Sequence, residues 1–152
     1  MRFDPVLAEH RFGCGLSPKI AAPDGVDAML DGLHGPDVMA DRFPIEGFDT
    51  FLARMRARAE LSRQRRDNRG TELAEEARKG IRLLNKQARK DHWHWMAAHI
   101  ARRIWTQTAF RERLAFFWAD HFTATGKRGI IRRGTSPYMQ DLRPHLAGRF
   151  AD

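Results

Sequence analysis

The sequence has only one cysteine, Cys14, which excludes an internal disulfide framework and a zinc site built from four cysteines. It also lacks any apolar run approaching the roughly 20 residues of a transmembrane helix. The first five residues carry no apolar core of the kind found in signal peptides, so we expect a cytoplasmic protein. No segment shows the sustained apolar and polar alternation of a β-strand. These absences favour an all-α protein.

The composition indicates one folded domain with a strong positive charge. The 152 residues are 42% hydrophobic, which is enough for a sizeable core, and we expect a single helical domain over residues 1–152. Lysine and arginine number 27 against 19 acidic residues, for a net charge of +8. This balance favours an anionic partner, whether nucleic acid, acidic lipid or an acidic protein.

A long helical hairpin is predicted over residues 48–107. Apolar residues recur there at three- and four-residue steps, first from Phe48 to Ala59 and then from Leu73 to Ile104. A turn at residues 67–70 separates the two runs, with Gly70 available for positive φ. The second run is either one helix about 50 Å long or two helices broken near Asp91. We therefore predict a multi-helix domain with a long, basic antiparallel hairpin.

Shorter helices flank the hairpin. Asp4-Pro5 is a helix start, residues 110–121 form an aromatic-rich helix, and the last helix runs from Ser136 to Phe150. Because that last helix has no stop signal, we expect the chain to be the N-terminal part of a longer protein. The apolar positions predict a core that contains Leu7, Phe12, Leu30, Trp93, Ile100, Ile104, Leu114, Phe117, Trp118, Leu142 and Leu146.

His121 is the one candidate for catalysis. It lies on the apolar stripe of the aromatic-rich helix, where a buried imidazole needs partners for both ring nitrogens. A structural histidine and a metal ligand or general base both fit this position. Asp120 cannot assist from the same helix, because adjacent side chains diverge by about 100°.

The other histidines predict no metal site, and no motif predicts a cofactor. His92 and His99 lie two turns apart, about 10 Å, which is too far to share one zinc ion. The sequence has no His-Glu-x-x-His and no Cys-x-x-Cys. The Thr125–Arg128 string lacks the upstream glycine and the Ser or Thr after lysine that a Walker loop requires.

Two basic clusters are candidate anion sites. One is the glycine-bounded loop 126–134, with Lys127, Arg128, Arg132 and Arg133. The other is the hairpin face with Arg78, Arg82 and Lys86 at four-residue steps, where like charges repel one another. Residues 49–91 hold six of the eight net positive charges. An ordinary solvated surface is the alternative for both clusters.

Three segments resemble a known family. They are Phe3–Pro5 with Ala8–Pro18, then Glu112–Phe122, then Tyr138–Gln140 with Leu142–His145, Ala147-Gly148 and Phe150. The middle segment is the most specific, because Phe-Trp-x-x-His-Phe is an uncommon string. On these segments the chain resembles the bacterial family catalogued as domain of unknown function 1800. The resemblance implies a largely helical protein of several hundred residues, of which this chain is the N-terminal portion, and it transfers no catalytic residue.

Three functional hypotheses follow. The first is a structural or interaction module without catalysis, whose partner is the missing C-terminal part of its own chain or another protein. The second is a module that binds nucleic acid or another anion through the arginine-rich hairpin and the 126–134 loop. The third is a fragment of an enzyme that uses His121.

Overall fold

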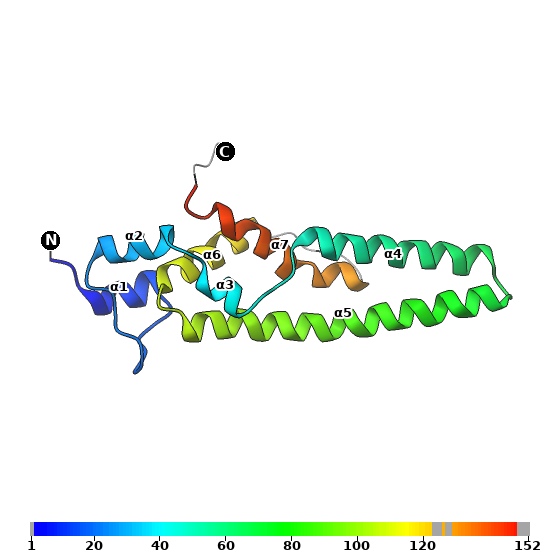
Figure 1. Ribbon diagram of the computed structural model, residues 1–152, viewed down its shortest axis with the longest axis horizontal. Coiled ribbons are helices and arrows are strands. Elements are labelled where there is room, and N and C mark those ends of the chain that lie inside the picture. Colours follow the sequence, from blue (N-terminus) through cyan, green and yellow to red (C-terminus); the bar gives the residue numbers. More distant parts are fainter. Residues whose placement is uncertain (1, 123–125, 127–128, 149–152) are drawn as a thin grey trace. The chain divides into compact units, whose positions relative to one another are not determined.

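The structure is a computed structural model that describes residues 2–122, 126 and 129–148, and its regular elements in that range are all helical (Figure 1). They are α1 (Pro5–Phe12), α2 (Val26–His34), α3 (Val38–Arg42), α4 (Phe48–Asp67), α5 (Glu72–Trp105), α6 (Ala109–His121), η1 (Gly129–Arg133), α7 (Thr135–Leu142) and η2 (Arg143–His145). The all-α prediction is confirmed. The last helix is shorter than predicted, since α7 ends at Leu142 and Pro144 occupies a separate 3₁₀ turn.

The chain divides into two compact units. The first unit comprises residues 1–44, 97–123 and 141–152, and the second comprises residues 45–96 and 124–140. Helix α5 contributes its C-terminal part to the first unit and the remainder to the second. Each unit is described separately below.

The second unit is built on the α4–α5 hairpin, whose two helices run antiparallel (Figure 1). Phe51, which is 1% exposed, meets Trp95 edge-on with 6.5 Å between ring centroids. Farther along the hairpin, a Cβ added at Gly80 would lie 3.0 Å from Leu61, so glycine permits close approach there. Gly70 adopts a φ of +86° in the connecting turn, a conformation that favours glycine. These contacts confirm the predicted hairpin.

Helix α5 is continuous over 34 residues, or about 51 Å. The alternative break near Asp91 is wrong because this carboxylate has partners on both helices. Its Oδ2 accepts a 2.5 Å hydrogen bond from Arg54 of α4, and its Oδ1 accepts a 2.7 Å bond from Gln87 of α5. A half-buried acid that is paired in this way does not disturb the helix.

The burial pattern overturns much of the predicted core. In the C-terminal half of α5, Trp95, Ala98 and Arg102 are buried, and Arg102 is fully inaccessible. The apolar positions on the opposite face are exposed, with Trp93 70% and Ile104 56% exposed.

Seven predicted core residues are exposed: Leu7, Phe12, Leu30, Trp93, Ile100, Ile104 and Phe117. Four are partly buried: Leu114, Trp118, Leu142 and Leu146. Periodicity located the apolar faces correctly but could not say which face neighbouring elements would cover.

Two buried arginines organise the first unit by occupying the ends of its short helices. Arg111 of α6 donates to the carbonyls of Gly32, Leu33 and Gly35 at the C-terminal end of α2, with a 3.2 Å bond to Gly32. Arg102 donates to the Phe43 carbonyl after α3 at 3.0 and 2.7 Å. Carbonyls at helix ends have no partner within the helix, so a buried guanidinium both satisfies them and complements the helix dipole.

Candidate functional site

The most strongly connected group of charges in the first unit surrounds Arg143. Its guanidinium forms two hydrogen bonds to each of two carboxylates, at 2.7 and 3.0 Å to Glu112 and at 2.8 Å twice to Asp37. The Arg143 and Glu112 side chains are only 6% and 4% exposed. Asp37 also caps α3 by accepting the Ala40 N–H at 3.1 Å. The cluster therefore joins α3, α6 and η2.

The pKa shifts in this cluster show that it is held in its ionised form. Burial alone would lower the pKa of Arg143, but its hydrogen bonds to Glu112 and Asp37 outweigh burial and raise the pKa above the usual range. Burial would raise the pKa of Asp37, and the bonds from Arg143 reverse this and lower it. Since both shifts stabilise the charges, the cluster is a structural ion network and not a poised acid–base pair.

His99 lies on the half-buried side of α5 and cannot easily accept a proton. Burial, and then the charges of Arg102, Arg103 and Arg143, lower its pKa from 6.5 to about 4. Its Nε2 atom is buried without a hydrogen-bond partner. His92 is also partly buried, whereas His94 is exposed. Among the described residues, no group of three or more His, Cys, Asp or Glu side chains could hold a metal ion.

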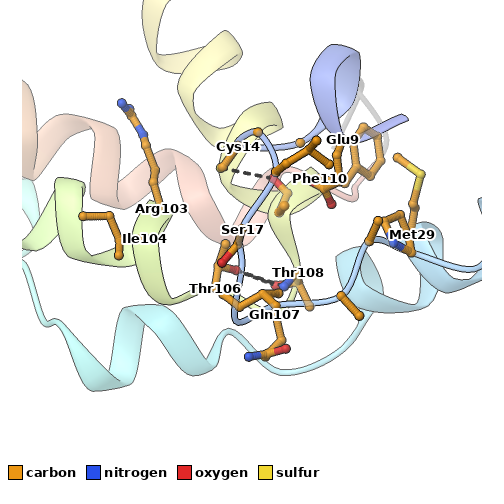
Figure 2. A pocket seen from close by; sticks show the side chains of 18 of the residues that line it. Glu9, Cys14, Ser17, Met29, Arg103, Ile104, Thr106, Gln107, Thr108 and Phe110 are labelled. Atoms are coloured by element: carbon orange, nitrogen blue, oxygen red, sulfur yellow. Dashed lines mark hydrogen bonds between the residues drawn. The ribbon is translucent and has the colours of Figure 1, made fainter. Parts of the chain in front are cut away.

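A ligand-sized pocket lies beside Cys14 in the first unit (Figure 2). Its volume is about 380 Å³, and it lies between the segment after α1 and the junction of α5 and α6. Thr106, which is 2% exposed, accepts the Thr108 N–H at 3.0 Å. Arg103 lines the pocket but extends away from the threonines in Figure 2, and its guanidinium lies 4.2 Å from the Phe116 ring centroid.

The pocket has no activated nucleophile at Cys14. The thiol lies 3.8 Å from the Ala109 carbonyl, which it can reach as a weak donor. Burial, followed by the negative charge of Glu112, raises the pKa of this thiol. Because the thiolate is the reactive form, a raised pKa leaves Cys14 as an inert thiol at neutral pH. The pocket can admit a small molecule, and its lining combines hydroxyl groups and apolar walls with the polar side chains of Glu9, Arg103 and Gln107. Burial raises the pKa of the Glu9 carboxyl.

His121 is exposed at the C-terminal end of α6, so the expectation that it is interior is wrong. Its ring stacks on Phe117 at 6.1 Å and meets Phe122 edge-on at 4.9 Å. Trp118 in turn stacks on Phe122 at 5.4 Å. We call Phe117, Trp118, His121 and Phe122 the α6 aromatic cluster. It is a partly exposed aromatic surface, and a catalytic role for His121 stays a prediction.

The predicted anion-binding residues lie in different parts of the second unit. Arg82 and Lys86 are exposed on α5, while Arg78 pairs with Glu75 at 3.2 Å. Arg132 and Arg133 belong to η1, which is followed by Gly134 beside Phe51. Phe51 contacts Trp95 of α5. Along the helix axis, Trp95 is about 14 Å from Lys86 and about 26 Å from Arg78. Lys127 and Arg128 lie outside the described residues. Of the loop cluster, only Arg132 and Arg133 are among the described residues, and anion binding by either cluster stays a prediction.

The first unit also has an apolar groove between α1 and α2. Its volume is about 600 Å³, and its walls include Leu7, Phe12, Val26 and Leu30, each between 42% and 57% exposed. Phe110 of α6 also lines it. We call this feature the α1–α2 groove.

Comparison with known proteins identifies the family. The model of a family described as protein of unknown function (DUF1800) matches residues 8–152, which is nearly the whole chain. The chain belongs to this family. No curated protein and no solved structure matches it. Within the described residues, no helix is both long and apolar enough to cross a membrane.

Parts of all three segments that carry the family resemblance lie in the first unit. Cys14 of the first segment contacts the Ala109 carbonyl at the start of α6. Glu112 of the second segment and Arg143 of the third form the buried ion pair. In this family member, therefore, residues far apart in the sequence assemble one structural core.

Sequence reasoning missed both main features of the first unit. The buried arginines were not predicted, because charged residues usually lie on the protein surface even when their sequence neighbours are apolar. The signal was present in α6, where Arg111 and Glu112 stand among apolar residues, but their partners lie more than 30 residues away. The α1–α2 groove was missed because its walls were assigned to the core.

Proposed function

We propose that this chain is a helical interaction module with no catalysis of its own, and that its first unit binds another polypeptide. The observation that carries the proposal is the inverted burial of the first unit. Arg102 is 0% exposed and Arg143 is 6% exposed, whereas Ile100 and Phe117 are both 54% exposed. Phe117 also belongs to the α6 aromatic cluster, in which Phe122 is 38% exposed, and contiguous exposed apolar side chains are typical of surfaces that a partner covers.

Two groups of the first unit, the Cys14 thiol and the Arg143 network, support binding over catalysis. The thiol of Cys14 has a raised pKa, and the Arg143 network is fixed in its ionised form. Both groups lack the shift toward neutral pH that general acids, bases and nucleophiles need. The partner is a further part of a longer form of this chain or a separate protein.

Site-specific photocrosslinking in the natural host tests this proposal. A photoreactive phenylalanine analogue replaces Phe117 or Ile100 in the first unit, and Asp41, an exposed residue on α3, is the matched control. We expect crosslinks from the two apolar positions to one defined polypeptide, identified by mass spectrometry, and none from Asp41. Crosslinking no greater than at Asp41 would contradict an interaction role for the first unit.

A second candidate function, anion or nucleic-acid binding by the hairpin, is favoured by its unpaired cations. Arg82 and Lys86 are exposed on α5 and form no ion pair within the described part of the chain. The proposed contacts are to phosphates, so affinity should fall steeply with added salt.

Gel-shift titration at two salt concentrations tests the second candidate. The double variant Arg82→Glu, Lys86→Glu should weaken binding to a DNA or RNA probe at least tenfold, whereas Arg113→Glu on α6 of the first unit should leave it unchanged. Binding that is insensitive to salt, or equal loss in the control, would contradict a phosphate-binding hairpin.

A further inference from the structure

We infer that the α1–α2 groove binds one amphipathic helix of a partner protein, and that this helix carries acidic residues along one edge and basic residues along the other. The inference rests on the proposed interaction function and specifies one of its surfaces. Three observations support it: the volume of the groove, the exposure of its walls and the charges near its two edges.

The groove has the dimensions and chemistry of a helix-binding site. Its volume of about 600 Å³ lies in the range of well-formed ligand sites. Its walls are Leu7 and Phe12 from α1, Val26 and Leu30 from α2, and Phe110 from α6. An amphipathic helix fills such a groove with anchors at positions i, i+3, i+4 and i+7. The apolar side chains that α1 and α2 contribute to the groove suit a single stripe of that kind.

The α1 edge of the groove is basic. Arg2 and Arg11 line it, and neither forms an ion pair among the described residues. Asp4 lies on the same edge, but its Oδ1 accepts the Leu7 N–H at 3.1 Å and so caps α1. The two guanidinium groups are therefore available to carboxylates of a bound helix.

The α2 edge is acidic. Val26, Met29 and Leu30 line the groove. Asp27 and Asp31 are not part of the lining, but each follows a lining residue, and helix geometry therefore places it about 100° farther around α2. Both aspartates are exposed, and neither forms an ion pair in the described range. A partner helix is complementary when its acidic edge faces Arg2 and Arg11 and its basic edge faces Asp27 and Asp31. Because turning the helix end for end would exchange the two edges, the charges also set the direction in which the helix binds.

A direct binding assay with designed peptides tests the inference. The probe is a fluorescein-labelled helical peptide of about 18 residues with a leucine stripe, one glutamate edge and one lysine edge. Fluorescence anisotropy with the 152-residue chain should show saturable binding. A peptide of the same leucine stripe with lysine on both edges should bind at least fivefold more weakly, because its second lysine edge faces Arg2 and Arg11.

Matched variants locate the binding site. Leu30→Glu should weaken binding at least tenfold, while Val38→Glu, at a position that is 59% exposed outside the groove, should leave it unchanged. The double variant Arg2→Glu, Arg11→Glu makes both edges acidic, so it should prefer the peptide with two lysine edges. Circular dichroism of each variant verifies that the helices are retained.

Several outcomes would overturn the inference. Failure of every peptide to bind is one, and binding that Leu30→Glu leaves intact is another. A dimer in analytical ultracentrifugation that Leu30→Glu converts to a monomer would identify a second copy of the chain as the occupant instead. If Phe117 gives photocrosslinks but no peptide binds, the proposed interaction function is supported and only the helix-binding groove is contradicted. The failure of each proposal can therefore be told apart.

Discussion

The two units of this protein achieve stability in opposite ways. The hairpin unit buries aromatic and small apolar residues such as Phe51 and Ala88, and it leaves most of its charges in water. The first unit buries arginine and glutamate beside Leu33 and Met39, while several of its large apolar side chains, such as Ile100 and Phe117, are exposed. A hairpin of regular helices can satisfy its own backbone, whereas short helices leave many unpaired ends, and buried guanidinium groups complete them. The comparison shows why apolar content alone is a poor guide to the core of a unit made of short helices.

The largest expected effect comes from breaking the buried ion network of the first unit. Glu112→Ala leaves Arg143 without one of its two carboxylates in a site that excludes water, so we expect a loss of about 3–5 kcal/mol of unfolding free energy. Urea denaturation measures this loss. The matched control is Arg78→Ala in the exposed Arg78–Glu75 pair, where we expect less than about 0.5 kcal/mol. Similar losses in the two variants would remove the proposed contrast between the units.

The next effect concerns the hairpin core. Phe51→Ala should cost about 3–4 kcal/mol, because it empties a site that is 1% exposed and packed against Trp95. Trp93→Ala, two residues before that tryptophan and 70% exposed, should cost less than about 0.5 kcal/mol. Thermal or urea unfolding distinguishes the two variants. If Trp93→Ala proved as damaging as Phe51→Ala, the open face of α5 would have to be covered in solution.

A smaller effect should appear as a pH dependence of the first unit. His99 has a folded pKa of about 4 against 6.5 for an unperturbed histidine, so the unfolded chain binds the proton more tightly. Stability is therefore fully present above pH 6.5 and is lost as the pH falls from 6.5 toward 4, by on the order of 2 kcal/mol.

His99→Phe should flatten this part of the stability profile measured by urea unfolding. The lowered pKa of Asp37 has its effect below the ordinary value of 3.8, outside that interval. An unchanged slope between pH 6.5 and 4 in the variant would show that another group is responsible.

The smallest expected effect is a loss of stability from replacing a glycine with positive φ, and it should be similar in both units. Gly15 in the first unit and Gly70 in the hairpin turn have φ values of +94° and +86°, and neither has a neighbour within contact of an added Cβ. Gly15→Ala and Gly70→Ala should therefore each cost about 1 kcal/mol through backbone strain alone. Unequal losses in chemical denaturation would indicate that one of these turns carries a further structural demand.

Several features were accessible from short stretches of sequence. Asp4-Pro5 correctly marked the start of α1, where Asp4 caps the helix. The apolar spacing from Phe48 to Ala88 correctly located both hairpin helices, and Gly70 correctly marked their turn. These predictions succeed because caps, turns and helical faces depend on residues within a few positions of one another.

The candidate site was far less accessible. His121 was expected in the interior and is exposed, and anion binding by the two predicted basic clusters stays a prediction. The Arg143 network joins residues that are 31 and 106 positions apart, which no local pattern relates. The edges of the α1–α2 groove likewise depend on how two separate helices come together.

Local composition was thus sufficient to establish a basic, all-helical chain with a long hairpin, because helix formation and helix ends obey short-range rules. Long-range packing alone determined that Arg102, Glu112 and Arg143 would be buried and that Leu30, Ile100 and Phe117 would stay open. The physical reason is that a side chain is buried only when another segment covers it. For the charged residues this covering is favourable only when that segment also brings the carbonyl or carboxylate partner.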